Sequence, residues 1–137
     1  EGSSSLMEET FKFEIISPEK IIFSNNSTMV TLPSYEGDMS VLKYHISIIT
    51  FLRPGIIKVQ TSKSDFEEFF VQDGIVEYFN DSLVTLSASA INVKSVSKDF
   101  INNLSKNTLD KLAEKDITDH YRYMLNHKLN ALEKIRP

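Results

Sequence analysis

Apolar and polar residues alternate along the first two thirds of the chain, which is the pattern of strands with one buried face. In Phe11–Ile15, for example, Lys12 and Glu14 separate three apolar residues. Similar short segments follow, each ended by residue types that favour turns, such as proline, glycine, asparagine and aspartate. They cover residues 21–23, 28–32, 47–52, 56–60, 67–72, 75–79 and 83–87. Short strands at this spacing predict an all-β sandwich or barrel.

The breaks between these segments predict the turns. Residues 24–27 and 33–38 are expected to lie outside strands, because they are rich in asparagine and serine or contain Pro33 and Gly37. Tight turns are expected at Asp73-Gly74 and at Asn80-Asp81.

The hydrophobic period changes after about residue 93. Apolar residues then recur at steps of three and four, first from Val96 to Leu112 and again from Ile117 to Ile135, which predicts two amphipathic helices. Ser97 and Thr118 are the expected N-caps, and the short connection makes the helices antiparallel. The predicted fold class is mainly β plus α, an N-terminal β-sandwich followed by a C-terminal antiparallel α-helical hairpin. The expected division is an expression scar without fixed structure at 1–6, the sandwich at 7–92 and the hairpin at 93–137.

Composition excludes several classes of function. The 137 residues carry a net charge of −4 with no clustered basic segment, which argues against a nucleic-acid surface. Cysteine is absent, so disulfides, thiolate metal sites and a cysteine nucleophile are excluded. The longest apolar run, IITFL at Ile48–Leu52, is far shorter than the roughly 20 residues of a membrane span. The polar start EGSSSL does not resemble a secretory signal.

The sequence contains no convincing constellation for catalysis or metal binding. Asp38 and His45 are an imaginable acid–base pair, but no nucleophile motif or oxyanion device accompanies them. His120 and His127 lie about two helical turns apart, too far for the usual metal pair on a helix. Neither the GxxxxGK[ST] phosphate loop nor the GxGxxG turn is present. We therefore predict no catalytic residues, no metal ligands and no cofactor.

Several blocks of sequence occur in a familiar order. FKFEIISPEKIIFS at Phe11–Ser24 has a strand, an S-P-E turn and an apolar run ending in F-S. It is followed by VTLP at 30–33, EGD at 36–38, His45, LRPG at 52–55 and VQDGIVE at 71–77, and then by the predicted helices. In order and spacing the chain resembles the epsilon subunit of bacterial F-type ATP synthase from Phe11 onward. It departs from that family at Ser40, where a second glycine is usual, and at Lys43-Tyr44, where Pro-Gly or Ala-Gly is common.

The resemblance implies a non-catalytic rotor component of the central stalk, which couples the gamma subunit to the c-ring in proton-driven ATP synthesis. It implies partners in gamma, in the c-ring and, through the helices, in the alpha and beta subunits. The expected location is peripheral, on the cytoplasmic face of the bacterial inner membrane, with the membrane reached only through the c-ring. The c-ring contact is expected at Glu36, Gly37, Asp38 and Met39, and the gamma contact at Ser17, His45, Ile46 and Thr50.

Two alternatives to this function remain open at the level of sequence. The first is an ATP-sensing inhibitory switch, since some members of the family bind ATP through an I/L-D-x-x-R-A motif. Here Ser97 and Phe100 stand where the motif has aspartate and arginine, so we predict no such nucleotide site. Few basic residues follow residue 117, so we expect weak or absent inhibition of hydrolysis by the hairpin. The second alternative is an unrelated sandwich with a ligand pocket.

Overall fold

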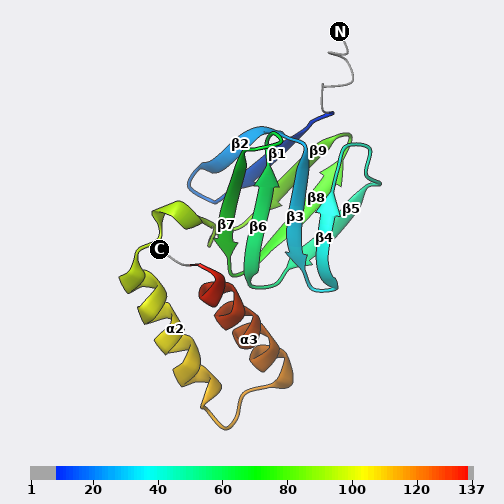
Figure 1. Ribbon diagram of the computed structural model, residues 1–137. Helices are drawn as coiled ribbons and strands as arrows, with labels where there is room; N and C mark the ends of the chain where they lie inside the picture. Colours follow the sequence, from blue (N-terminus) through cyan, green and yellow to red (C-terminus); the bar gives the residue numbers. More distant parts are fainter. Residues whose placement is uncertain (1–8, 136–137) are drawn as a thin grey trace.

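A computed structural model describes residues 9–135, which form a β-sandwich with two helices beneath it (Figure 1). The predicted scar at residues 1–6 lies outside the described residues. The strands are β1 (Phe11–Ile16), β2 (Ile21–Ser27), β3 (Met29–Ser34), β4 (Gly37–Val41), β5 (Ile48–Leu52), β6 (Gly55–Gln60), β7 (Phe66–Val71), β8 (Gly74–Phe79), β9 (Ser82–Leu86) and β10 (Ile91–Asn92). A short 3-10 helix, η1 (Val93–Ser95), leads into α2 (Lys98–Leu112) and α3 (Asp119–Lys134).

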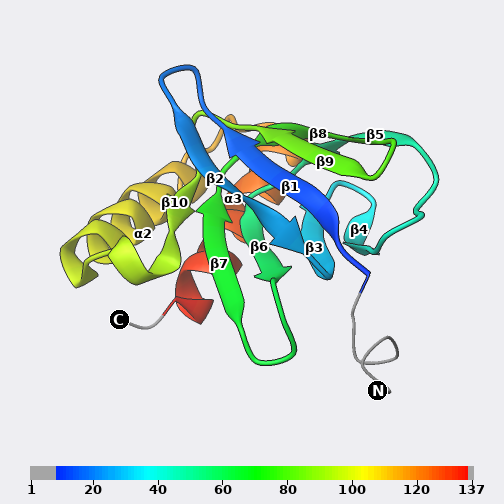
Figure 2. The same ribbon diagram turned by 90° about the horizontal axis from the view of Figure 1, so that it is seen from above.

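The strands form two layers joined at one corner. One layer has the order β10-β7-β6-β3-β4 and the other β5-β8-β9-β1-β2, and a single bridge between Ser34 and Leu52 connects β3 with β5. Figure 2, seen from above, shows β1, β8 and β9 lying over β3, β6 and β7. The β1–β9 pairing is parallel and the other pairings are antiparallel, so the first strand is held between β9 and β2.

The main core lies between the two layers and follows the alternation seen in the sequence. Phe11, Phe13 and Ile15 of β1 point inward and are almost fully buried, while Lys12 between them is exposed. Leu32 and Tyr78 fill the space from β3 and β8. Burial of such large side chains contributes roughly 1.5–3 kcal/mol each to folding.

The predicted loop at 33–38 is wrong in its extent. Strand β3 continues to Ser34 and β4 begins at Gly37, so only Tyr35-Glu36 form the turn between them. Pro33 fits inside β3 because its carbonyl still accepts a hydrogen bond from the Arg53 backbone N–H at 3.0 Å. In β4 the polar residues at 38 and 40 are exposed and the apolar residues at 39 and 41 face inward, the alternation of a strand.

Two other strand boundaries differ from the prediction. The predicted break at 24–27 is instead the second half of β2. This edge strand exposes Ser24, Asn25 and Asn26 to solvent, whereas Ser27 at its end is buried. Strand β10 was not predicted, since it consists of only Ile91–Asn92 paired with β7. The turn at Asn80-Asp81 is confirmed, and both residues have positive φ (53° and 59°), as a tight two-residue hairpin requires.

Both helices begin where the sequence predicted. The Ser97 hydroxyl accepts the Phe100 N–H at 3.0 Å, and the Thr118 hydroxyl accepts the Tyr121 N–H at 3.0 Å. The helices pack side by side as a hairpin (Figure 1). No helix within residues 9–135 combines the length and apolar character needed to cross a bilayer.

A second hydrophobic cluster attaches the hairpin to the sandwich. Phe70 of β7 is completely buried in this cluster, beneath residues from both helices. Its other buried members are Val96, Ile101, Ala131, Leu132 and Ile135. This cluster involves the start of α2 and the end of α3, which is the root of the hairpin.

Candidate protein-interaction surfaces

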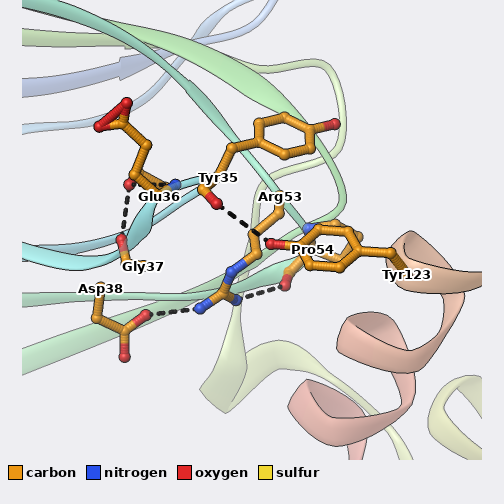
Figure 3. A network of polar contacts seen from close by, with 8 residues as sticks. Tyr35, Glu36, Gly37, Asp38, Arg53, Pro54 and Tyr123 are labelled. Atoms are coloured by element: carbon orange, nitrogen blue, oxygen red, sulfur yellow. Dashed lines mark hydrogen bonds and ion pairs between the residues drawn. The ribbon is translucent and has the colours of Figure 1, made fainter. Parts of the chain in front are cut away.

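The β3–β4 turn presents the first set of predicted contact residues (Figure 3). The Ser34 hydroxyl donates to the Gly37 carbonyl at 2.6 Å and accepts the Glu36 N–H at 3.3 Å, which fixes the shape of the turn. Gly37 has φ +119°, a conformation that side chains rarely adopt. The carboxylate of Glu36 is therefore held on an exposed, ordered tip.

Asp38 is tied to the neighbouring turn through an ion pair. Its Oδ1 lies 3.0 Å from a nitrogen of Arg53, whose guanidinium also donates to the Pro54 carbonyl at 3.3 Å (Figure 3). The Arg53 side chain is only 14% exposed, whereas the Asp38 side chain is 67% exposed. Met39 points the other way and packs against the main core. The structure thus brings Glu36, Gly37 and Asp38 together at one tip and turns Met39 inward.

The connection between β4 and β5 carries His45 and Ile46. Ile46 is 76% exposed, the most exposed large apolar side chain of the described residues. The His45 ring packs edge-on against Tyr78, with centroids 5.7 Å apart, and its Nδ1 lies 2.7 Å from the Ile46 carbonyl. This connection lies at the far end of β4 from the Glu36 turn, so the two predicted contact regions are separated by the length of that strand.

Asp81 organises the same connection from the β8–β9 turn. Its Oδ1 accepts the Tyr78 hydroxyl at 2.8 Å and the Tyr44 N–H at 3.2 Å. The hydrogen bond from Tyr78 holds the pKa of Asp81 below its ordinary value, and the Tyr44 N–H acts in the same direction. Asp81 therefore stays ionised and keeps the connection in place at neutral pH.

Ser17 lies apart from His45. The residue is buried, and its hydroxyl donates to the Lys20 carbonyl at 3.1 Å while accepting the Lys20 N–H at 3.2 Å. It lines an open, mostly apolar groove of about 640 Å³ together with Tyr35 and Phe51. Thr50, in the middle of β5, is half-buried. Of the predicted gamma contacts, only His45 and Ile46 are therefore brought together.

Sequence reasoning missed an exposed apolar face on the outer side of the second layer. Ile49 and Phe51 of β5 are 66% and 59% exposed, and Phe79 of β8 and Leu86 of β9 are 64% and 50% exposed. The sequence did contain an indication of this face. Residues 48–52 are apolar at nearly every position, whereas apolar and polar residues should alternate in a strand with one solvent-exposed face. Glu77 lies on the same face, opposite Ile49, so the apolar side chains surround one exposed carboxylate. Exposed apolar side chains gathered on one face in this way mark interaction surfaces.

The positions that align with the family's nucleotide motif have structural roles here. Ser97 caps α2 with its hydroxyl, and Phe100 packs against the cluster at the hairpin root. Within residues 9–135 no group of three or more histidine, aspartate or glutamate side chains is arranged to hold a metal ion.

Comparisons with known proteins point to the same family that the order of the sequence blocks resembles. A sequence profile of the ATP synthase delta/epsilon chain β-sandwich domain matches residues 10–93. The ATP synthase epsilon chain of Pelagibacter ubique (strain HTCC1062) is 43% identical over 130 residues, covering 94% of this chain and 99% of the relative. The chain belongs to the ATP synthase epsilon chain family. The family member of Parvibaculum lavamentivorans (strain DS-1) is 31% identical and covers 95% of this chain.

The fold of this family member is also found in solved structures. A chain in the Euglena gracilis mitochondrial ATP synthase assembly superposes with a TM-score of 0.71 at 15% identity, over 90% of this chain and 78% of that chain. A chain in the central stalk and c-ring of the Tetrahymena thermophila mitochondrial enzyme gives a TM-score of 0.64 at 14% identity, over 93% and 96% of the two chains. Identities this low establish the shared fold and nothing further.

Proposed function

We propose that this chain is a non-catalytic rotor component of the central stalk of an F-type ATP synthase, where it couples the gamma subunit to the c-ring. The observation that carries the proposal is the 43% identity to an epsilon chain over 94% of this chain. The c-ring named for the two structural relatives supports the same class of partner.

The gamma subunit is proposed to bind the outer face of the second layer. The predicted residues His45 and Ile46 would contribute from the edge of this surface, in the connection that leads into β5. Thr50 is half-buried and points to the inner side of the layer, because strand side chains alternate, so it would support the exposed Ile49 and Phe51 from behind. Its apolar members are Ile49, Phe51, Phe79 and Leu86. Ser17 would contribute from the groove rather than through its hydroxyl, which is already engaged within its own turn.

The β3–β4 turn is proposed to meet the polar loops of the c-ring. Glu36 and Asp38 give this turn two exposed carboxylates, which would be complementary to basic residues on the c-ring loops. Gly37 sets the shape of the turn, and Met39 holds its base on the core. Charge pairs of this kind favour correct orientation more than raw affinity.

The proposed division is a binding sandwich at 7–92 and a hairpin at 93–137 directed toward the alpha and beta subunits. The chain would then lie at the cytoplasmic face of the bacterial inner membrane, reaching the membrane only through the c-ring.

Binding to the cognate gamma subunit tests the proposal. Ile49→Glu combined with Phe79→Glu replaces two exposed apolar side chains of this face with charges beside the existing Glu77, so the affinity of the chain for gamma should fall by about a hundredfold or more. Phe66→Glu is the matched control, because Phe66 is also exposed (40%) but lies on β7 of the other layer. Equal retention of the double variant and the control would refute the assignment of this face, and failure of the unmodified chain to bind gamma would refute the proposed function.

A further inference from the structure

Helix α3 contacts the sandwich in a second place besides the hydrophobic root of the hairpin. Tyr35, on the β3–β4 turn, stacks against two rings of α3 at small interplanar angles. Its ring centroid lies 5.8 Å from that of His120 at 19° and 6.2 Å from that of Tyr123 at 14°. His127, one helical turn further, packs edge-on against Tyr123 with centroids 4.4 Å apart. Four rings therefore connect the turn with the helix.

Two hydrogen bonds reinforce this stack. The Tyr123 hydroxyl donates to the Tyr35 backbone carbonyl at 3.3 Å (Figure 3), and the Tyr35 hydroxyl donates to the Met124 sulfur at 3.1 Å. Burial, followed by the nearby Tyr123 and Asp73, raises the pKa of Tyr35 above its ordinary value. Tyr35 therefore keeps its proton throughout the neutral and acid range.

His127 lies beside a crowded charged cavity. The half-buried imidazole lines a space of about 220 Å³ with Arg53, Asp38 and Lys134. The Arg53 guanidinium is already paired with Asp38 at 3.0 Å. These are the charged groups that face His127 from the β4 strand, from the β5–β6 turn and from α3 itself. A proton on His127 would add a third cation around a single carboxylate.

We propose that Tyr35, His120, Tyr123 and His127 form a latch that holds α3 against the β3–β4 turn, and that protonation of His127 releases it. Every group of this latch belongs to the chain itself, so the latch does not depend on the proposed function. Release would leave the hairpin attached through the hydrophobic cluster at its root.

The direction of the pH effect follows from proton linkage. Burial lowers the pKa of His127, Arg53 lowers it further, and Asp38 opposes them. Because the docked form binds the proton less readily than the released form, the docked form is fully favoured above the ordinary histidine pKa of about 6.5. Its advantage is lost as the pH falls below that value, and the loss is complete once the pH is below the lowered pKa. For each pH unit by which the pKa of His127 in the docked form lies below that in the released form, the ratio of docked to released molecules falls about tenfold at low pH.

A distance measurement within the full chain tests the latch. The chain has no cysteine, so Lys63→Cys and Lys115→Cys, both at exposed positions, give one label on the sandwich and one at the hairpin tip. Energy transfer should report one docked distance at pH 8 and a growing released population as the pH falls from 7 to 5. His127→Phe keeps an aromatic ring but cannot be protonated, so it should abolish the pH effect. His120→Phe, the matched control on the same stack, should retain it.

Two outcomes would overturn the proposal. One is a distance that does not change with pH in the unmodified chain, and the other is loss of the pH effect in His120→Phe rather than in His127→Phe. Tyr35→Ala removes an exposed side chain and should shift the population toward the released form at every pH, with the circular dichroism of the sandwich unchanged. Magnetic resonance titration gives an independent readout, because the pKa of His127 should rise toward its ordinary value in Tyr35→Ala. An equal pKa in both chains would mean that His127 does not sense docking.

Discussion

At the scale of single residues, Tyr44 is the clearest conflict between sequence and backbone. It has φ +69°, in the left-handed region that costs a side-chain-bearing residue roughly 1–2 kcal/mol. The related family commonly has glycine at this position, which adopts that conformation freely. The hydrogen bond from the Tyr44 N–H to Asp81 helps to hold the strained residue in place.

Replacing Tyr44 with glycine should stabilise the chain. The Tyr44 side chain is 68% exposed, so little buried surface is lost, and relief of backbone strain should raise the free energy of unfolding by about 0.5–1 kcal/mol. Urea denaturation measures the change. Tyr44→Ala is the control, because it removes the same ring but keeps the strain, and a glycine variant no more stable than the alanine variant would contradict the explanation.

At the scale of elements, the sequence predicted an element boundary best where a side chain forms a hydrogen bond with a free backbone group. Ser97 and Thr118 were predicted as caps because their hydroxyls can accept free N–H groups at a helix start, and both do so. Strand β4 was missed because Pro33 and Gly37 suggested a loop, although the residues at 38–41 alternate as a strand should. Residue propensities count proline against a strand. They do not show that the Pro33 carbonyl can still accept a hydrogen bond from the neighbouring segment, as it does here.

The cap of α3 provides a test at this scale. Thr118→Ala removes the acceptor of the Tyr121 N–H and should cost about 1 kcal/mol, seen as faster hydrogen exchange in the first turn of the helix. Thr118→Ser keeps the hydroxyl and should exchange like the unmodified chain. If serine and alanine behave alike, the hydrogen bond is not what stabilises this helix end.

At the scale of the whole molecule, the order of blocks predicted the sandwich and hairpin, but it did not predict how their surfaces are grouped. Ser17 and His45 were assigned to one contact, yet the structure places Ser17 in the groove beside Tyr35 and His45 beyond the far end of β4. The stack of Tyr35 on α3 was also unforeseen, since it joins residues nearly ninety positions apart. Such contacts depend on tertiary packing, which no local pattern reports.

A chain ending at Val93 tests the hairpin at this scale. The main core lies wholly within the sandwich, so the shortened chain should fold, with some loss of stability because Phe70 becomes exposed. In the described part of α3 the basic residues are only Arg122, Lys128 and Lys134, too few for strong attraction to acidic segments. ATP hydrolysis by the cognate alpha, beta and gamma assembly should therefore be nearly equal with either chain bound. Strong inhibition by the full chain alone would make the hairpin a brake.

The parallel pairing of β1 with β9 has a consequence for how the chain matures. Strand β1 registers with residues 82–86, so the amino-terminal strand has no neighbour on that side until almost the entire sandwich has been synthesised. Contacts between such distant segments close slowly, because a long stretch of chain must be ordered first. On the ribosome, closure of the sandwich should therefore wait for β9 and coincide with the emergence of the helices. The root of the hairpin packs on β7, which pairs with the neighbouring β6 and is synthesised before either helix, so closure at β9 and docking of the hairpin are two separate late steps.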